Sequence, residues 1–140
     1  MISNQKNNEA LVITSINKPN LAIKNFEKLC KKNNTDFIFV ADKKTPKFKY
    51  ADSLKFLSVK YQESLSFKIC KKIPINSYSR KNIGYLYSIL RGAKKIYETD
   101  DDNHPKENFF SQNIENLKNY RIKENGFINI YKYFLNKKID

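Results

Sequence analysis

Three consecutive carboxylates, Asp100, Asp101 and Asp102, directly follow a short apolar segment of the chain. Like charges at this spacing repel one another and raise one another's pKa. A divalent cation such as Mg²⁺ or Mn²⁺ relieves this repulsion because it gives the hard oxygen ligands a common partner. Bound Mg²⁺ usually keeps open coordination positions, which the oxygens of a diphosphate can fill. The Asp-x-Asp spacing therefore predicts a metal site that bridges the protein to a nucleotide diphosphate. The alternative is a solvated acidic turn that balances Lys94 and Lys95.

A second candidate lies at the predicted N-terminus of a helix, where Arg80 and Asn82 are found. Unpaired backbone N–H groups and the helix dipole favour an anion at such a terminus. The planar guanidinium of Arg80 adds a fork that fits phosphate or carboxylate. We therefore expect these residues to contact an anionic ligand. The alternative is a surface arginine, or one paired with Asp42 or with the aspartates at 100–102.

Polar residues also follow the first two predicted strands. Thr14 and Ser15 end the first strand and could hydrogen-bond a base or a ribose; the alternative is capping of the segment that follows. Asp42 and Lys44 lie in the polar loop after the second strand, and Asp42 could accept a hydrogen bond from a ribose or base. The alternative for Asp42 is an Asx turn. All four residues are candidates for ligand binding.

The sequence predicts alternating strands and helices, and these elements position the candidate residues. Short apolar runs predict strands at residues 10–15, 36–41, 55–59 and 95–98. Helical spacing predicts helices over residues 20–33, over 61–71, and from Ser77 or Ser79 to about Arg91, with Gly92 following the last. Gly84 and Ser88 are four residues apart on that last helix, and small residues there would let it lie close on a sheet.

This order of elements predicts an α/β fold with a mostly parallel, Rossmann-like sheet. Right-handed crossovers bring the carboxyl ends of parallel strands to one edge, where open α/β sheets bind ligands. The turns after residues 15, 42 and 100 should therefore meet. The length of 140 residues fits one domain, with residues 1–9 as a flexible leader, residues 104–126 as an irregular stretch and residues 127–135 apolar enough to pack.

The net charge of +13 results from 27 Lys and Arg against 14 Asp and Glu. Only Arg80, Arg91 and Arg121 are arginines, and the lysines occur in scattered pairs rather than on one predicted helix. Lys is the poorer residue for bidentate recognition of bases or phosphates. We therefore interpret the charge as a solvated surface of biased composition, and a nucleic-acid partner is not expected. A basic module that binds nucleic acid or an anionic surface stays as the alternative function.

The sequence lacks the signatures of several other classes of protein. There is no run of 18 apolar residues, so no membrane span is expected. Cys30 and Cys70 form no Cys-x-x-Cys pair, and they fit two reduced, buried thiols of a cytoplasmic protein. Neither a Gly-x-Gly-x-x-Gly nor a Gly-x-x-x-x-Gly-Lys-Ser/Thr motif is present.

Three segments together resemble a known family. They are residues 10–19 (ALVITSINKP), 40–46 (VADKKTP) and 76–103 (NSYSRKNIGYLYSILRGAKKIYETDDDN). The resemblance is to the STELLO-type glycosyltransferases, which are similar in turn to the reversibly glycosylated polypeptides, or UDP-arabinopyranose mutases. It implies a shortened GT-A-like nucleotide-diphospho-sugar transferase fold with a DxD metal site. It also implies that Asp100, Asp101 and Asp102 bind metal and diphosphate and that Arg80 contacts the nucleotide sugar.

The resemblance covers the half of these relatives that binds the nucleotide sugar. The relatives continue, after a segment like residues 129–134, into a Trp-Pro-Arg-Gly-type motif and an acceptor-side half, whereas this sequence has no Trp. We therefore expect a Mn²⁺- or Mg²⁺-dependent domain that binds a UDP-linked sugar, with a partner chain supplying the acceptor half. The alternative is a truncated domain that binds sugar nucleotides without turnover. No catalytic residue is identified, and enzyme activity stays open.

Overall fold

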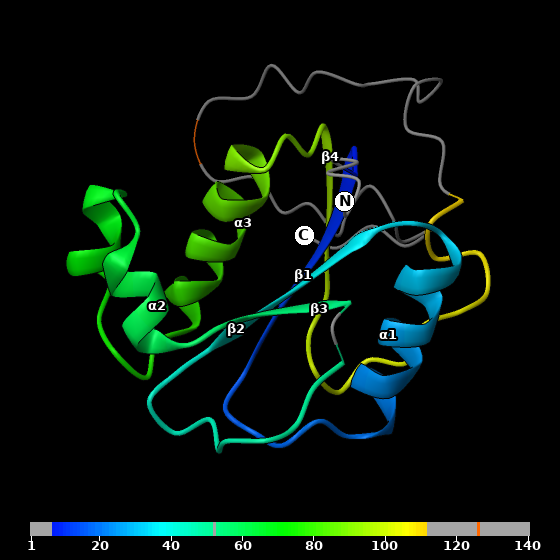
Figure 1. The fold of residues 1–140 in the computed structure, drawn as a ribbon, viewed down its shortest axis with the longest axis horizontal. Helices are drawn as coiled ribbons and strands as arrows, with labels where there is room; N and C mark the ends of the chain where they lie inside the picture. The colour runs from blue at the N-terminus through cyan, green and yellow to red at the C-terminus, as the bar shows by residue number, and fades with distance from the viewer. Residues whose placement is uncertain (1–6, 52, 112–125, 127–140) are drawn as a thin grey trace, which may run out of the picture.

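The computed structural model describes residues 7–51, 53–111 and 126 (Figure 1). It contains a four-stranded, all-parallel sheet in the order β3-β2-β1-β4. The strands are β1 (Glu9–Ser15), β2 (Asp36–Ala41), β3 (Leu54–Leu57) and β4 (Lys95–Glu98). The helices are α1 (Leu21–Lys32), α2 (Val59–Ser64) and α3 (Lys81–Leu90), with short 3₁₀ helices η1 (Lys68–Lys71) and η2 (Tyr78–Arg80). The predicted Rossmann-like α/β class is confirmed.

Most element boundaries agree with the sequence pattern, and one predicted helix is wrong. Instead of one helix over residues 61–71, α2 ends at Ser64 and η1 begins at Lys68. Leu65 adopts an extended backbone (φ −71°, ψ 146°) and packs against the core. The helical spacing of Tyr61, Leu65 and Ile69 therefore does not form one face. Most of the predicted irregular stretch and the apolar segment at 127–135 lie outside the described residues.

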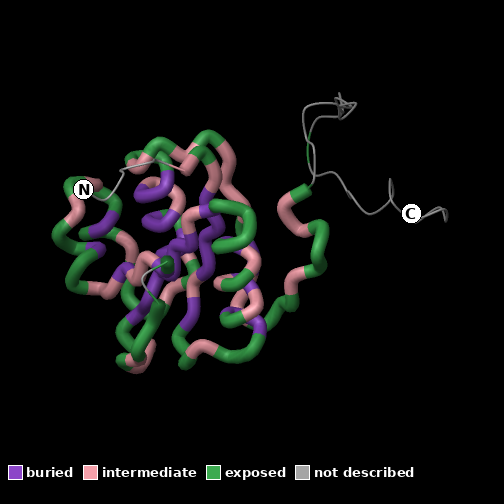
Figure 2. The backbone as a smooth tube through the Cα atoms, turned by 45° about the vertical axis from the view of Figure 1, so that its right-hand side comes forward, coloured by how far each residue is buried: buried purple, intermediate pink, exposed green. Residues whose placement is uncertain are grey.

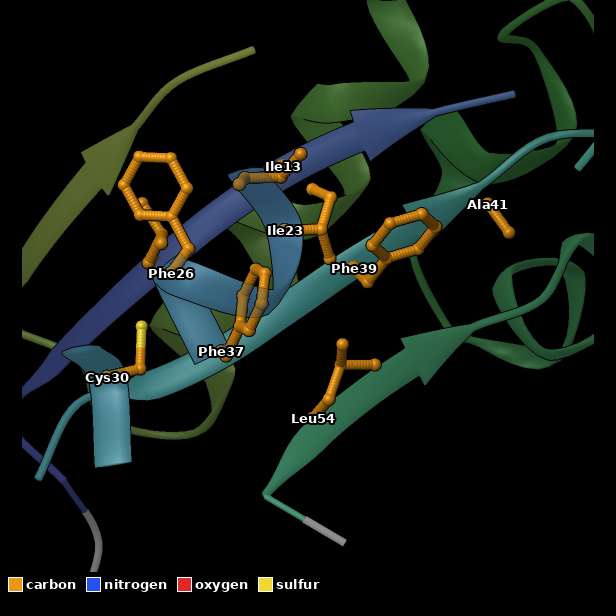
Figure 3. Close-up of a cluster of buried hydrophobic side chains, with 9 residues drawn as sticks. Ile13, Ile23, Phe26, Cys30, Phe37, Phe39, Ala41 and Leu54 are labelled. Carbon is orange, nitrogen blue, oxygen red and sulfur yellow. The ribbon is translucent and has the colours of Figure 1, made fainter. Parts of the chain in front are cut away.

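Two apolar clusters cover the two faces of the sheet. Alternate residues of a strand point to opposite faces, so neighbours along β1 and β2 join different clusters. One cluster lies beneath α1 and contains Leu11, Ile13, Ile23, Phe26, Cys30, Phe37, Phe39, Ala41 and Leu54 (Figure 3). The other lies on the α3 side and contains Ala10, Val12, Ile38, Val40, Leu57 and Tyr87. Figure 2 shows that the buried residues concentrate in the sheet and along the inner faces of the helices.

The sheet is therefore a layer with helices packed on both faces. Both cysteines are buried and unpaired, as expected. Within residues 7–51 and 53–111, no helix combines the length and the apolar character that crossing a membrane requires.

Helix α3 approaches the sheet at Gly84. A Cβ atom built at Gly84 would lie 2.5 Å from Val12 Cγ1 and 2.6 Å from Val40 Cγ2. Ser88, one turn further, is buried and donates a hydrogen bond to the Gly84 carbonyl oxygen (2.8 Å). The predicted close approach of small residues is confirmed, and it sets the distance between α3 and the central strands.

We expect Gly84→Ala to lower the free energy of unfolding by about 1–3 kcal/mol, because the added methyl group overpacks the contact with Val12 and Val40. Ile89→Ala is the matched control, because Ile89 is exposed on the same helix. It should change stability by about 0.5 kcal/mol or less. Urea denaturation followed by circular dichroism measures both. Equal effects of the two substitutions would contradict the close packing at Gly84.

Candidate functional site

An open cavity of about 440 Å³ lies at the carboxyl edge of the sheet. We call it the edge cavity. It is bordered by the turns after β1, β2 and β4 and by the loop before η2. Its lining residues are Thr14, Ser15, Ile16, Asn17, Asp42, Lys44, Asn76, Ser77, Tyr78, Asp100, Asp101 and Asp102. The three turns predicted to converge therefore do meet, and the cavity takes in all the candidate residues except Arg80 and Asn82.

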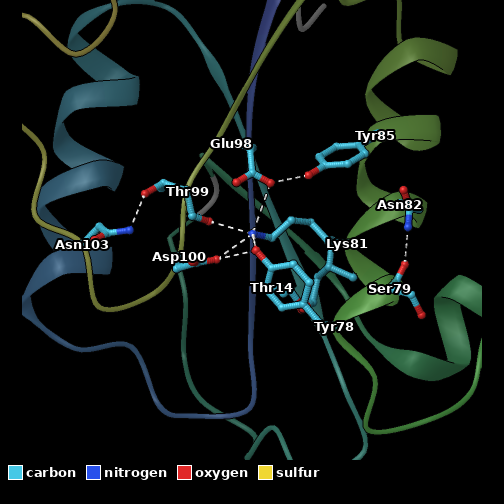
Figure 4. A network of polar contacts seen from close by, with 11 residues as sticks. Thr14, Tyr78, Ser79, Lys81, Asn82, Tyr85, Glu98, Thr99, Asp100 and Asn103 are labelled. Atoms are coloured by element: carbon cyan, nitrogen blue, oxygen red, sulfur yellow. Dashed lines mark hydrogen bonds and ion pairs between the residues drawn. The ribbon is translucent and has the colours of Figure 1, made fainter. Parts of the chain in front are cut away.

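The carboxylate of Asp100 is held by a buried ammonium. Its Oδ1 accepts hydrogen bonds from Lys81 Nζ (2.8 Å) and from the Tyr78 hydroxyl (2.7 Å), as drawn in Figure 4. Lys81 is only 2 % exposed, and its Nζ also donates to the Thr99 carbonyl oxygen (3.2 Å) and lies 3.3 Å from Glu98 Oε2. The acidic turn, Asp100–Asp102, thus rests on a positive charge supplied by the protein.

This ammonium reverses the expected electrostatics of the turn. The hydrogen bond from Lys81, followed by that from Tyr78, holds the pKa of Asp100 below its usual value. Repulsion within the triplet was expected to raise the pKa instead. Burial alone would lower the pKa of Lys81, but its hydrogen bonds to Asp100 and Tyr78 and the charge of Glu98 outweigh burial and raise it. Lys81 was not among the residues selected from the sequence.

Asp101 ties the acidic turn to the start of α1. Its Oδ2 accepts a hydrogen bond from the Ser15 hydroxyl and another from Asn17 Nδ2 (3.2 Å). Its backbone oxygen accepts from Asn20 Nδ2 (2.7 Å), while Asn20 Oδ1 caps α1 by accepting from Ile23 N (3.0 Å). Hydrogen bonds therefore join the turns after β1 and β4 directly.

The hydroxyl groups of the last two residues of β1 are already used as donors. Thr14 Oγ1 donates to the Val40 carbonyl oxygen (3.0 Å), and Ser15 Oγ donates to Asp101 and accepts from Asn17 N (3.0 Å). Toward a ligand in the edge cavity, the Thr14 oxygen is therefore available as an acceptor. This restricts the predicted contacts with a ribose or base to groups on the ligand that donate.

Asp42 fixes the loop that carries Tyr78. The Asp42 carboxylate is 6 % exposed and accepts from the backbone N–H groups of Lys43 (2.6 Å), Asn76 (2.9 Å) and Ser77 (3.1 Å). Both oxygens are thus engaged with the protein. Asp42 lines the edge cavity as predicted, and its observed bonds join the turn after β2 to the loop before η2.

Arg80 and Asn82 do not line the edge cavity. The Arg80 side chain is 1 % exposed, and its Nε and Nη2 donate to Gln62 Oε1 (3.0 and 2.5 Å). Gln62 in turn donates to the carbonyl oxygens of Ala41 (2.7 Å) and Leu57 (2.6 Å). Asn82 donates to the Ser79 carbonyl oxygen on the exposed side of the helix.

The physical reason is the 3₁₀ turn η2 that precedes α3. It directs Arg80 into the interior and leaves Tyr78 at the cavity. Tyr78 and Lys81 are three residues apart, a spacing that puts two side chains on one face of a helical segment. This spacing is the sequence signal that could have identified them.

The chemistry of the acidic turn fits a hard divalent cation, although the protein oxygens alone are few. Among the described residues, Asp102 makes no side-chain hydrogen bond or ion pair, and the bonds of Asp100 and Asp101 use one carboxylate oxygen each. Nowhere in residues 7–51 and 53–111 do three or more His, Cys, Asp or Glu side chains gather as a ready metal site. Because Mg²⁺ takes six oxygen ligands, a cation at this turn would need further oxygens from water or a bound ligand.

Comparison with known proteins confirms the resemblance to the STELLO-type glycosyltransferases. The chain is 32 % identical over 94 residues, or 66 % of its length, to the Arabidopsis thaliana protein named "Probable glycosyltransferase STELLO1". It is 46 % identical over 46 residues, 33 % of its length, to "Probable glycosyltransferase STELLO2" of the same plant. The matched segments span only 12 % and 6 % of these relatives. No protein-family profile matches the chain.

We expect Asp42→Asn to lower the free energy of unfolding by about 1–3 kcal/mol, because the amide NH₂ group would face a backbone N–H donor that the carboxylate now accepts from. Glu63→Gln is the control, since it makes the same chemical change at an exposed position of α2. Urea denaturation of both variants checks the prediction. A loss no larger than in the control would show that the Asp42 bonds contribute no stability.

Proposed function

We propose that this glycosyltransferase-like domain binds a nucleoside-diphosphate sugar, UDP-linked, together with Mn²⁺ or Mg²⁺ at the acidic turn. The names of its relatives give the class, glycosyltransferase, and the nucleotide sugar and the metal are our extension of it. The observation that carries it is the edge cavity, where the acidic turn, the turn after β1 and the loop with Lys44 meet at the carboxyl edge of a parallel sheet.

The lining divides into two chemical halves. On one side, Asp102 and the remaining oxygens of Asp100 and Asp101 would hold the cation, which would compensate the negative charge of the diphosphate, the leaving group in sugar transfer. On another side, the exposed Lys44 offers an ammonium for a phosphate oxygen. This combination of acceptors and a cationic group suits a metal-bridged diphosphate.

Tyr78 would complete the site next to the sugar or the nucleoside. Tyr78 is 62 % exposed as a residue, while its hydroxyl is fixed between Lys81 Nζ (2.5 Å) and Asp100 Oδ1 (2.7 Å). An exposed aromatic ring in a fixed orientation offers a flat surface at small entropic cost, since few rotamers are lost on contact. Arg80 is not part of the proposed site, because its side chain points to Gln62.

Two hypotheses about sugar transfer follow from the short match to the relatives. In the first, a partner chain supplies the acceptor-binding half and the assembly transfers the sugar. In the second, the domain binds sugar nucleotides without turnover. Separate assays of sugar transfer and of UDP-sugar hydrolysis distinguish the two. The basic-module alternative gains no support from the edge cavity, because an acidic turn on its wall repels nucleic-acid phosphates.

We expect UDP-glucose to bind in the presence of Mn²⁺ and to bind weakly without it, as measured by isothermal titration calorimetry. Asp102→Asn should weaken the Mn²⁺-dependent binding by about tenfold or more, since a ligand oxygen with a full charge is lost. Glu63→Gln, on the exposed face of α2, should bind like the unaltered protein. Binding that ignores both Mn²⁺ and the Asp102 substitution would refute the proposed function. A panel of other nucleotide sugars then defines the base and sugar.

A further inference from the structure

Lys81 lies beneath the edge cavity and has no role in the proposed ligand contacts. It is one of the few fully buried cationic side chains of the core, and it does not line the cavity. Four oxygens surround its Nζ, at 2.5 Å (Tyr78 hydroxyl), 2.8 Å (Asp100 Oδ1), 3.2 Å (Thr99 carbonyl) and 3.3 Å (Glu98 Oε2). Two of the four belong to carboxylates, so the buried charge is compensated from the strand β4 and the acidic turn.

The position of this ammonium affects any second cation. A divalent ion held by the other oxygen of Asp100 would share that carboxylate with Lys81, and two positive charges so close repel each other strongly in a partly buried setting. Part of the negative charge of the acidic turn is therefore already neutralised before a metal arrives. A diphosphate changes this balance, because it brings its own negative charge and further oxygens.

We infer that Lys81 is a positioning residue that acts as the resident counter-ion of Asp100, so that the acidic turn holds a divalent cation weakly on its own and tightly only together with a diphosphate. The inference rests on the proposed function and deepens it. It follows from the buried site of the ammonium, its contact with Asp100 and the lack, in the described part of the chain, of a ready cluster of three metal-ligating side chains.

The inference has a thermodynamic form. If UDP raises the affinity for Mn²⁺ by some factor, Mn²⁺ raises the affinity for UDP by the same factor. Removal of the Lys81 charge should raise the affinity of the ligand-free turn for Mn²⁺, because Asp100 and Glu98 lose their counter-ion. The same change should reduce the coupling factor, since the diphosphate no longer has a repulsive charge to offset.

The test measures Mn²⁺ binding by electron paramagnetic resonance of free Mn²⁺, with and without UDP, after correction for the Mn²⁺–UDP complex in solution. Lys81→Met removes the charge, Lys81→Gln removes it while keeping a hydrogen-bond donor, and Lys81→Arg keeps it. We expect both neutral variants to bind Mn²⁺ about tenfold more tightly than the unaltered protein in the absence of UDP, with a coupling factor reduced about tenfold. Lys81→Arg should resemble the unaltered protein.

The outcomes separate this inference from the proposed function. If folded neutral variants, judged by circular dichroism, bind Mn²⁺ no more tightly than the unaltered protein, Lys81 is not the counter-ion and the inference is overturned. If neither neutral variant folds, the unaltered protein decides, because Mn²⁺ affinity that is equal with and without UDP also overturns it. Failure of the unaltered protein to bind UDP-glucose with Mn²⁺ refutes the proposed function itself.

Discussion

The parallel pairing of β1 with both β2 and β4 is the constraint on which the site depends. It aligns the three strands in one direction, so that their carboxyl ends open at one edge. The edge cavity is lined by residues that are distant in the sequence because of this alignment. The two apolar clusters, one on each face, keep the strands in register, since a shift of one residue would exchange their side chains between the faces.

Buried polar bonds then fix the loops that the sheet only brings near. Gln62 joins the ends of β2 and β3 to the Arg80 guanidinium, and Asp42 joins the turn after β2 to the loop before η2. A buried guanidinium is costly to desolvate, and its hydrogen bonds offset part of that cost. These bonds hold the loop that carries Tyr78 at the cavity.

The fold follows from the sequence more fully than the site does. Short apolar runs identified the four strands of the described residues, and Gly84 with Ser88 indicated the close helix, because these signals are local in the chain. The burial of Arg80 was not expected, because the 3₁₀ turn η2 before α3 was not predicted from the sequence. Lys81 was missed because its partners, Glu98 to Asp100, lie 17 to 19 residues further on and only the folded chain brings them together.

The bond between Ser15 and Asp101 joins residues 86 positions apart. Closing a loop of that length costs conformational entropy, and pairings between residues so distant in the sequence are slow to form. β4 and the acidic turn come last among the described strands, so a nascent chain still lacking residue 95 has most of its hydrophobic core and no carboxylate wall. Lys81, the counter-charge of Asp100, belongs to the part of the chain that carries this core and precedes the acidic turn in the sequence.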